Sequence, residues 1–188
     1  MPDYSRIARQ QMLREAEGYL DLIGHFPHSW KLSPAVRDRL AQRAIDLLAI
    51  ISLTHQSHFQ VSFLTGYAYR LMERYAAAVP HLEAAARIDE QELSPWIELG
   101  WCYKRLGKLD KAIEVLEEAL ESHHEEALVH YNLACYWALS KNVPMTVVYL
   151  AQAFDIESSY RDMVAGESDF DPVRHDPHFD ALVSKVVV

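Results

Sequence analysis

Cysteine, glycine and long apolar runs are all scarce in this chain, and each scarcity excludes a class of protein. The 188 residues include only Cys102 and Cys135, too few for a disulfide framework, so a cytoplasmic location is expected. Only six glycines are present, and neither a phosphate-binding loop nor a G-x-S-x-G nucleophile motif can be found. No apolar run approaches the roughly 18 residues that a membrane span needs, so no membrane association is expected.

Charge is also one-sided. The chain has 18 basic and 27 acidic residues, a net charge of −9, which argues against nucleic acid as a partner. Eight carboxylates lie between residues 155 and 180, whereas residues 1–43 hold seven basic against five acidic residues. These two ends could meet in a homodimer, although charged surfaces that simply stay solvated are the simpler interpretation.

Three stretches of the chain superimpose on one another at a spacing of 34 residues. The aligned sets are Gly66, Gly100 and Ala134; Tyr69, Tyr103 and Trp137; Ala78, Ala112 and Thr146; Leu82, Leu116 and Leu150; and Ala85, Ala119 and Ala153. A period of this length is typical of helix–turn–helix solenoids, whose units bury their apolar faces only by stacking. The sequence therefore predicts an all-α solenoid, an architecture that usually serves to hold another protein.

The middle stretch, residues 93–126, resembles a tetratricopeptide repeat of the form W-x2-L-G-x2-Y followed by A-x3-F-x2-A. The residues at these positions are Trp96, Leu99, Gly100, Tyr103, Ala112, Leu116 and Ala119, with Leu116 in place of the aromatic residue and Gly107 near the turn. Residues 59–92 and 127–160 match the pattern less completely. The resemblance implies a right-handed superhelix of antiparallel helix pairs, and we expect about four pairs plus a capping segment.

The conserved spacing has a physical meaning at three kinds of position. Gly100 and Ala112 are expected where two helices approach most closely, because a larger side chain would push the helices apart. Gly107 is expected to permit the turn between those helices. Thr146 replaces the small residue in the last repeat, and its hydroxyl is expected to bond to a carbonyl one turn earlier.

The N-terminal region, residues 1–58, is predicted to be a divergent helix pair. Apolar residues recur at helical spacing over residues 5–24, and a second helix is expected from Pro34 to about residue 54, with Ser33 as its N-cap. The enlarged loop between them carries Phe26 and Trp30. These aromatic residues are expected to cap the stack, with an exposed docking site as the alternative.

The C-terminal region, residues 161–188, is predicted to be a capping tail. It resembles the tail that follows the closing repeat of bacterial tetratricopeptide arrays, of the form D-F-x-P-x-R-x-D-P-x-F. The matching residues are Asp169, Phe170, Pro172, Arg174, Asp176, Pro177 and Phe179. The last helix has no successor to cover it, so the tail's apolar residues are expected to fold back over it. Asp176 and Pro177 are expected to begin a helix.

Three histidine pairs have the spacing of metal ligands on a helix: His25/His28, His55/His58 and His175/His178. Each pair stands in a different part of the chain and lacks the glutamate that a zinc protease requires. Neither cysteine has a recognisable histidine and carboxylate partner. We therefore expect no catalytic residues, no metal site and no cofactor, with a histidine-based metal-binding accessory protein as a minor alternative.

The family resemblance implies a concave groove lined by the first helix of each pair. Carried over to this chain, the groove residues are Phe63, Tyr67, Arg70, Ile97, Trp101, Lys104, Tyr131, Asn132 and Cys135. Aromatic residues and arginine are enriched in interface hot spots. The predicted function is a non-catalytic scaffold or adaptor that binds a protein or peptide segment. The alternatives are a self-associating structural protein, and a groove in which the N-terminal pair or the tail already covers Phe63 or Tyr131.

Overall fold

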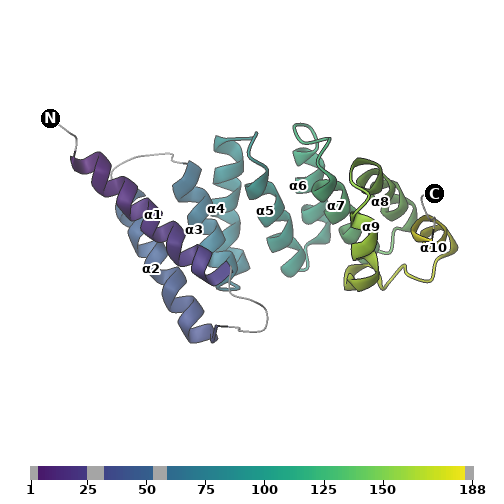
Figure 1. Cartoon of the computed structure of the whole chain (residues 1–188), viewed down its shortest axis with the longest axis horizontal. Coiled ribbons are helices and arrows are strands. Elements are labelled where there is room, and N and C mark those ends of the chain that lie inside the picture. The colour runs from purple at the N-terminus through teal and green to yellow at the C-terminus, as the bar shows by residue number, and fades with distance from the viewer. Residues whose placement is uncertain (1–3, 25–31, 53–58, 185–188) are drawn as a thin grey trace. The chain divides into compact units, whose positions relative to one another are not determined.

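The computed structural model describes residues 4–24, 32–52 and 59–184, and these are helices and turns without a strand. The chain divides into two compact units, unit 1 (Met1–Cys102) and unit 2 (Tyr103–Val188) (Figure 1). In the part of the chain that the structure covers, no helix is both long and apolar enough to cross a membrane. The predicted all-α architecture built from helix pairs is confirmed.

Unit 1 is formed by five helices: α1 (Tyr4–Gly24), α2 (Pro34–Ser52), α3 (Phe59–Leu71), α4 (Tyr75–Ile88) and most of α5 (Leu93–Arg105). Helix α1 packs against α2, α2 against α3, and α3 against α4. The buried residues that hold the first three helices together are mostly alanine and leucine: Ala16, Leu20, Ala41, Ala44, Leu48, Leu64 and Ala68. The predicted helices at 5–24 and from Pro34 are therefore present. Phe26, Trp30 and the pairs His25/His28 and His55/His58 lie outside the described residues.

Unit 2 begins within α5 and continues through α6 (Leu109–Ala119), α7 (Ala127–Leu139) and α8 (Val143–Ile156). Helix α6 packs on α7, and α7 packs on α8. The tail then forms four short elements: α9 (Tyr160–Met163), η1 (Val164–Gly166), η2 (Ser168–Phe170) and α10 (Pro177–Val183). Of these, α10 contacts α8 and η2 contacts α7.

The 34-residue register recurs in the backbone of three interhelical turns. Glu73, Gly107 and Lys141 have φ values of 60°, 71° and 59°, the left-handed conformation in which helices commonly end. In each turn the amide of the next residue donates a hydrogen bond of 2.9 Å to a carbonyl of the preceding helix. The pairs are Arg74 to Tyr69, Lys108 to Tyr103 and Asn142 to Trp137. The predicted role of Gly107 is confirmed. The sequence did not reveal that glutamate and lysine adopt the same conformation in the other two turns.

Close helix approach depends on small residues at fixed positions. A Cβ atom built on Gly66 of α3 would lie 2.7 Å from Cγ of Leu82 in α4, closer than real side chains come. Gly100 and Ala112 are both buried, each in its own unit. In α8 the Thr146 hydroxyl donates to the Asn142 carbonyl at 2.8 Å, as predicted. The extra polar group of Thr146 is thus satisfied inside the helix.

The tail covers the end of unit 2 with apolar side chains. Phe170, Val173 and Phe179 are almost fully buried, and the Phe170 and Phe179 rings lie 5.4 Å apart. Asp176 caps α10 by accepting a hydrogen bond from the His178 amide at 2.8 Å, and Pro177 occupies the first turn. The expected fold-back over the last long helix and the expected helix start are both confirmed.

Candidate functional site

The nine predicted groove residues fall into two sets, one in each unit. Unit 1 contains Phe63, Tyr67, Arg70, Ile97 and Trp101, and unit 2 contains Lys104, Tyr131, Asn132 and Cys135. The first set belongs to α3 and α5, and the second belongs to the end of α5 and to α7. The two sets have different surroundings and are described in turn.

Helix α3 carries a row of stacked aromatic rings. Phe59 and Phe63 are 5.9 Å apart with an interplanar angle of 9°, and Phe63 and Tyr67 are 5.9 Å apart with an angle of 19°. The spacing of four residues places successive rings on one face of the helix. Phe63 and Tyr67 are partly exposed, and both also pack against the buried core that α3 shares with α1 and α2. Burial raises the pKa of the Tyr67 phenol.

Arg70 joins the aromatic row of α3 to α5. Its guanidinium lies 4.6 Å from the centre of the Tyr67 ring and 5.4 Å from that of Trp101. It also pairs with Glu98, with Nε 2.6 Å from Oε2 and Nη2 donating to Oε1 at 3.0 Å. Burial raises the pKa of Glu98, while the charge of Arg70 acts in the opposite direction. We call Phe63, Tyr67, Arg70 and Trp101 the aromatic strip, in which the guanidinium is held at a fixed place.

Trp101 forms the α5 end of the aromatic strip. Its ring meets Tyr75 edge-on, with centroids 5.4 Å apart and an interplanar angle of 71°. Trp101 and Ile97 both keep partial exposure, whereas Trp96 of the same helix is buried. Neighbouring Cys102 is fully buried, and burial raises the pKa of its thiol to about 12. The strip therefore offers flat apolar and cationic contact area rather than a reactive nucleophile.

In unit 2, the tail lies on the predicted groove residues of α7. Tyr131 is only 4% exposed, because its ring packs 4.9 Å from Tyr160 and 5.6 Å from Phe170. Lys104 forms an ion pair with Asp169 of η2. Of the predicted residues in this unit, Asn132 and Lys104 keep partial exposure. Coverage of Tyr131 by the tail was one of the alternatives that the sequence left open, and it is the arrangement found here.

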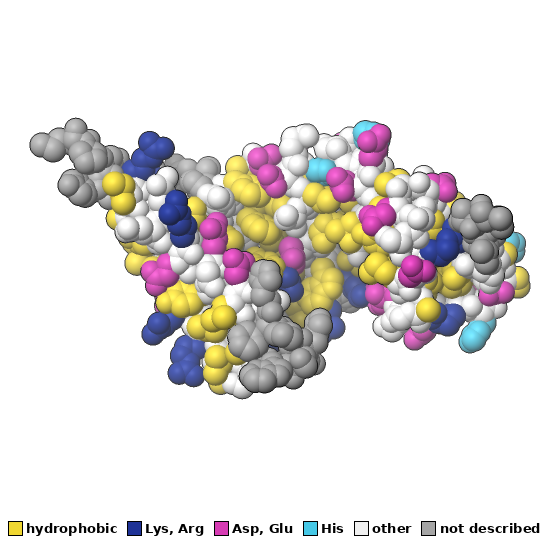
Figure 2. All heavy atoms as spheres, in the orientation of Figure 1, with side chains coloured by type: hydrophobic (Ala, Val, Ile, Leu, Met, Phe, Trp, Pro, Cys, Tyr) yellow, Lys and Arg dark blue, Asp and Glu magenta, His cyan; other side chains and the backbone are white. Residues whose placement is uncertain are grey.

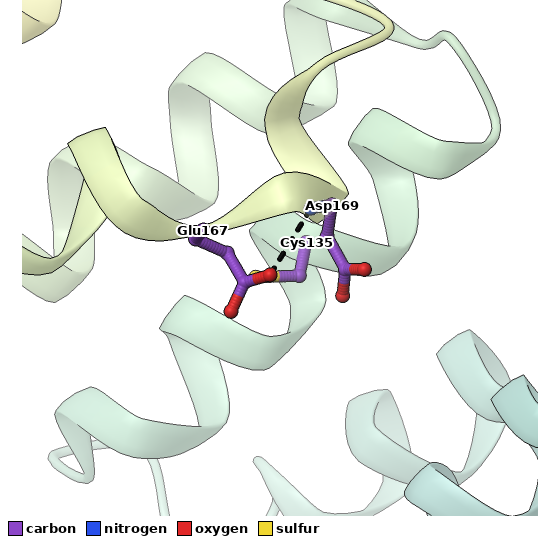
Figure 3. A group of neighbouring side chains, drawn as sticks. All are labelled: Cys135, Glu167 and Asp169. Carbon is purple, nitrogen blue, oxygen red and sulfur yellow. Dashed lines mark hydrogen bonds between the residues drawn. The ribbon is translucent and has the colours of Figure 1, made fainter.

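Cys135, Glu167 and Asp169 place three potential metal-binding atoms within 4.8 Å of one another (Figure 3). Glu167 accepts a hydrogen bond from the Asp169 amide at 3.0 Å and so caps η2. Burial raises the pKa of the Cys135 thiol, and the two carboxylates raise it further. The ammonium of Lys104 already balances Asp169. This charge balance suits a neutral thiol and an anchor for the tail better than a bound cation.

The remaining histidine pair lies on the surface of the tail. His175 and His178 are both exposed, and Nδ1 of His178 lies 3.3 Å from the Asp176 carboxylate that caps α10. Among the described residues, neither histidine belongs to a group of three ligands close enough to share a metal ion.

Sequence reasoning missed two partners that define these surroundings. It did not pair Glu98 with Arg70, although both occupy helices at the start of successive repeats, 28 residues apart. It also did not pair Asp169 with Lys104, which is 65 residues away. The first pairing follows from superposing the repeats, whereas the second depends on where the tail folds.

Part of the chain matches a known family. Residues 69–134 match the family described as tetratricopeptide repeat. No curated protein matches this sequence significantly.

Solved structures with the same fold include the protein MamA, at 18% identity and a TM-score of 0.67, covering 82% of this chain and 81% of that one. MamA from Desulfovibrio magneticus RS-1, residues 41 to the end, has 21% identity, a TM-score of 0.59, and coverage of 82% and 93%. YrrB, described as a protein with an unusual peptide-binding site, has 17% identity, a TM-score of 0.61, and coverage of 86% and 84%. At these identities the likeness establishes the fold alone.

Proposed function

We propose that this chain, a tetratricopeptide-repeat protein, is a non-catalytic scaffold or adaptor that binds a peptide or protein segment on the aromatic strip. The repeat fold supports a protein-interaction module, because stacked helix pairs expose long rows of side chains to a partner. The strip combines two partly exposed aromatic residues of α3 with Trp101 and a fixed arginine. These residue types are the ones enriched at the centres of protein interfaces.

The observation that carries this proposal is the fixed position of Arg70. Two ring faces and a two-point ion pair hold the guanidinium, so little side-chain entropy is left to lose when a partner binds. In unit 2 the tail already contacts Tyr131 and Lys104. The proposed binding surface is therefore the unit 1 part of the predicted groove, comprising Ile97 and the aromatic strip.

YrrB, which has the same fold, is described as having a peptide-binding site. That description supports the proposal of a peptide ligand for this chain. A non-catalytic role is supported by the chemistry of the strip. Burial raises the pKa of its one hydroxyl, the Tyr67 phenol, and burial keeps the adjacent Cys102 thiol protonated at physiological pH. Both cysteines are free and buried, which fits a reducing cytoplasm.

The experiment is a paired affinity capture followed by a measured affinity. Tagged wild-type protein and the Trp101→Ala variant are incubated with lysate of the native host, and the proteins held by the wild type alone are purified. Calorimetry then gives the affinity of each purified partner for the wild type, Trp101→Ala, Tyr67→Ala and Val148→Ala. Val148 is a matched control, because it is 49% exposed and belongs to unit 2.

A partner that docks on the strip should lose about 30-fold in affinity with Trp101→Ala, equivalent to about 2 kcal/mol. The Val148→Ala control should change affinity less than twofold. Equal affinities for all four proteins would exclude the strip as the binding surface. Light scattering of the protein alone tests the alternative of self-association.

A further inference from the structure

Unit 1 contains a second concavity, separate from the aromatic strip. A cleft of about 420 Å³ opens where the N-terminal half of α1 meets the end of α2 and the start of α3. This volume lies in the range of small ligand-binding clefts, about 300–1,000 Å³. We call it the arginine cleft, because Arg6, Arg9 and Arg14 contribute to its lining.

The three arginines give the cleft a positive charge that the surrounding helices do not neutralise. No ion pair or hydrogen bond joins Arg6, Arg9 or Arg14 to another residue that the structure describes. Glu17, at the far end, is the acidic residue of the lining. Figure 2 shows Lys and Arg side chains over the N-terminal part of α1 and Asp and Glu side chains farther along the helix, in a chain whose net charge is −9. Positive charge concentrated here favours an anionic ligand.

Stability of α1 does not explain this placement of charge. The first turn of α1 contains no acidic residue, and Arg6 and Arg9 lie close to the helix end. The positive end of the helix dipole favours acidic side chains and disfavours cations at that position. Arg6, in the first turn, therefore opposes the helix dipole, whereas an incoming anion would relieve the repulsion.

The rest of the lining is suited to a peptide rather than a small inorganic anion. Leu13, Ile51 and Val61 provide apolar contact, and Ile51 is almost completely buried. The side-chain amides of Gln10 and Gln60 can each donate to and accept from a peptide backbone. Phosphate alone would leave the apolar contacts unused.

Helix geometry sets the length of the ligand. Arg14 follows Arg6 by eight positions, which corresponds to a rise of roughly 12 Å along α1. An extended chain of about four residues covers the same distance. Carboxylates placed on either side of one apolar side chain would then reach the arginines while the apolar group enters the cleft.

We propose that the arginine cleft binds an extended acidic peptide segment in which carboxylates flank an apolar residue. This site uses no residue of the aromatic strip, so it is a second recognition surface of the same unit.

The test measures fluorescence anisotropy of a panel of labelled hexapeptides, each with two to four Asp or Glu residues around one Leu. Both peptide termini are blocked, so that a terminal carboxylate cannot contribute. The variant Arg6→Gln/Arg9→Gln removes two cleft charges, and Arg14→Glu tests the third. Arg39→Gln/Arg43→Gln is the matched control, since both residues are exposed on α2 and lie outside the cleft lining.

We expect binding of at least one peptide to weaken at least tenfold in Arg6→Gln/Arg9→Gln, and less than twofold in the control. Replacing the peptide's carboxylates by amides, or its Leu by Ser, should also weaken binding at least tenfold. No variant should melt below the wild type, which separates loss of the site from loss of the fold.

Four results would each overturn the proposal. One is the absence of binding by the whole panel, and another is an equal loss in the cleft and control variants. The third is competition by inorganic phosphate or single-stranded DNA as effective as that by the peptides. The fourth is self-association of the protein that Arg6→Gln/Arg9→Gln abolishes, because the occupant would then be a second copy of the chain.

Discussion

Replacing Gly66 by alanine should destabilise the protein, whereas the same replacement at Gly18 should stabilise it. Both glycines lie inside helices of unit 1, Gly66 in α3 and Gly18 in α1. In each variant the substitution adds one methyl group and removes the flexibility of a helical glycine. The two sites differ in the space that receives the methyl group, so the comparison isolates the packing of one helix against another.

The magnitudes follow from the surroundings of each Cβ. At Gly18 nothing lies within 4 Å, so only the helix propensity changes, in favour of alanine by about 1 kcal/mol. At Gly66 the new carbon would lie 2.7 Å from Cγ, 2.8 Å from Cδ2 and 3.1 Å from the backbone nitrogen of Leu82. Leu82 is fully buried, so α4 itself must move. Overpacking of this kind costs about 1–3 kcal/mol, which outweighs the gain in propensity.

Urea unfolding of both variants and the wild type, followed by circular dichroism, measures these effects. For a slope of about 1–3 kcal/mol/M, the two midpoints should move in opposite directions and differ by about 1 M. Similar slopes for the three proteins are required for the comparison. If Gly66→Ala raises the midpoint as much as Gly18→Ala does, then α3 and α4 do not approach as closely as described here.

Three further predictions concern single residues. Lys141→Gly should raise the melting temperature by about 2–4 °C, and Gly107→Ala should lower it by a similar amount. The reason is that the left-handed conformation costs a residue with a Cβ atom about 1–2 kcal/mol. Equal melting temperatures for the two variants would contradict this turn geometry. Trp96→Ala should lower the free energy of unfolding, measured in urea, by about 3–5 kcal/mol, because Trp96 is buried. Trp101→Ala should lower it by less than half as much, because Trp101 is half-buried. The reverse order would contradict the assignment of Trp96 to the core and of Trp101 to the surface. Burial raises the pKa of the Cys102 thiol from 9.0 to about 12, so between these pH values the folded state binds more protons than the unfolded state, and stability should fall as the pH rises. The urea midpoint should therefore decline less between about pH 8 and 10.5 in Cys102→Ala than in the wild type. An equal decline in the two proteins would exclude the thiol as a contributor.

The helical framework could be predicted from the sequence because its signals are local and repeated. Helices α3, α5 and α7 begin at Phe59, Leu93 and Ala127, which are the residues where the 34-residue register places the start of each repeat. The N-cap at Asp176 and the internal hydroxyl bond of Thr146 also follow from residues at most four positions away.

Contacts between distant segments could not be predicted in the same way. Nothing in the local sequence around Lys104 distinguishes a side chain open to a partner from one paired with Asp169 of the tail. The same holds for the arginine cleft, where Arg6 and Arg9 look like ordinary charges on the surface of an amphipathic helix. They form a cleft only because α2 and α3 pack beside them.

Because the tail covers α7, part of unit 2 stays exposed while the chain is being synthesised. A ribosome synthesises α7 before the residues that cover it, because Tyr131 precedes Phe170, whose ring packs against it, by 39 positions (170 − 131). At synthesis rates of about 5–20 residues per second, the interval is roughly 2–8 s. During this interval α1 to α4 have all the partners that they contact in unit 1, whereas the rings of α7 still face solvent. Unit 2 is thus the part of the newborn chain that a chaperone would protect.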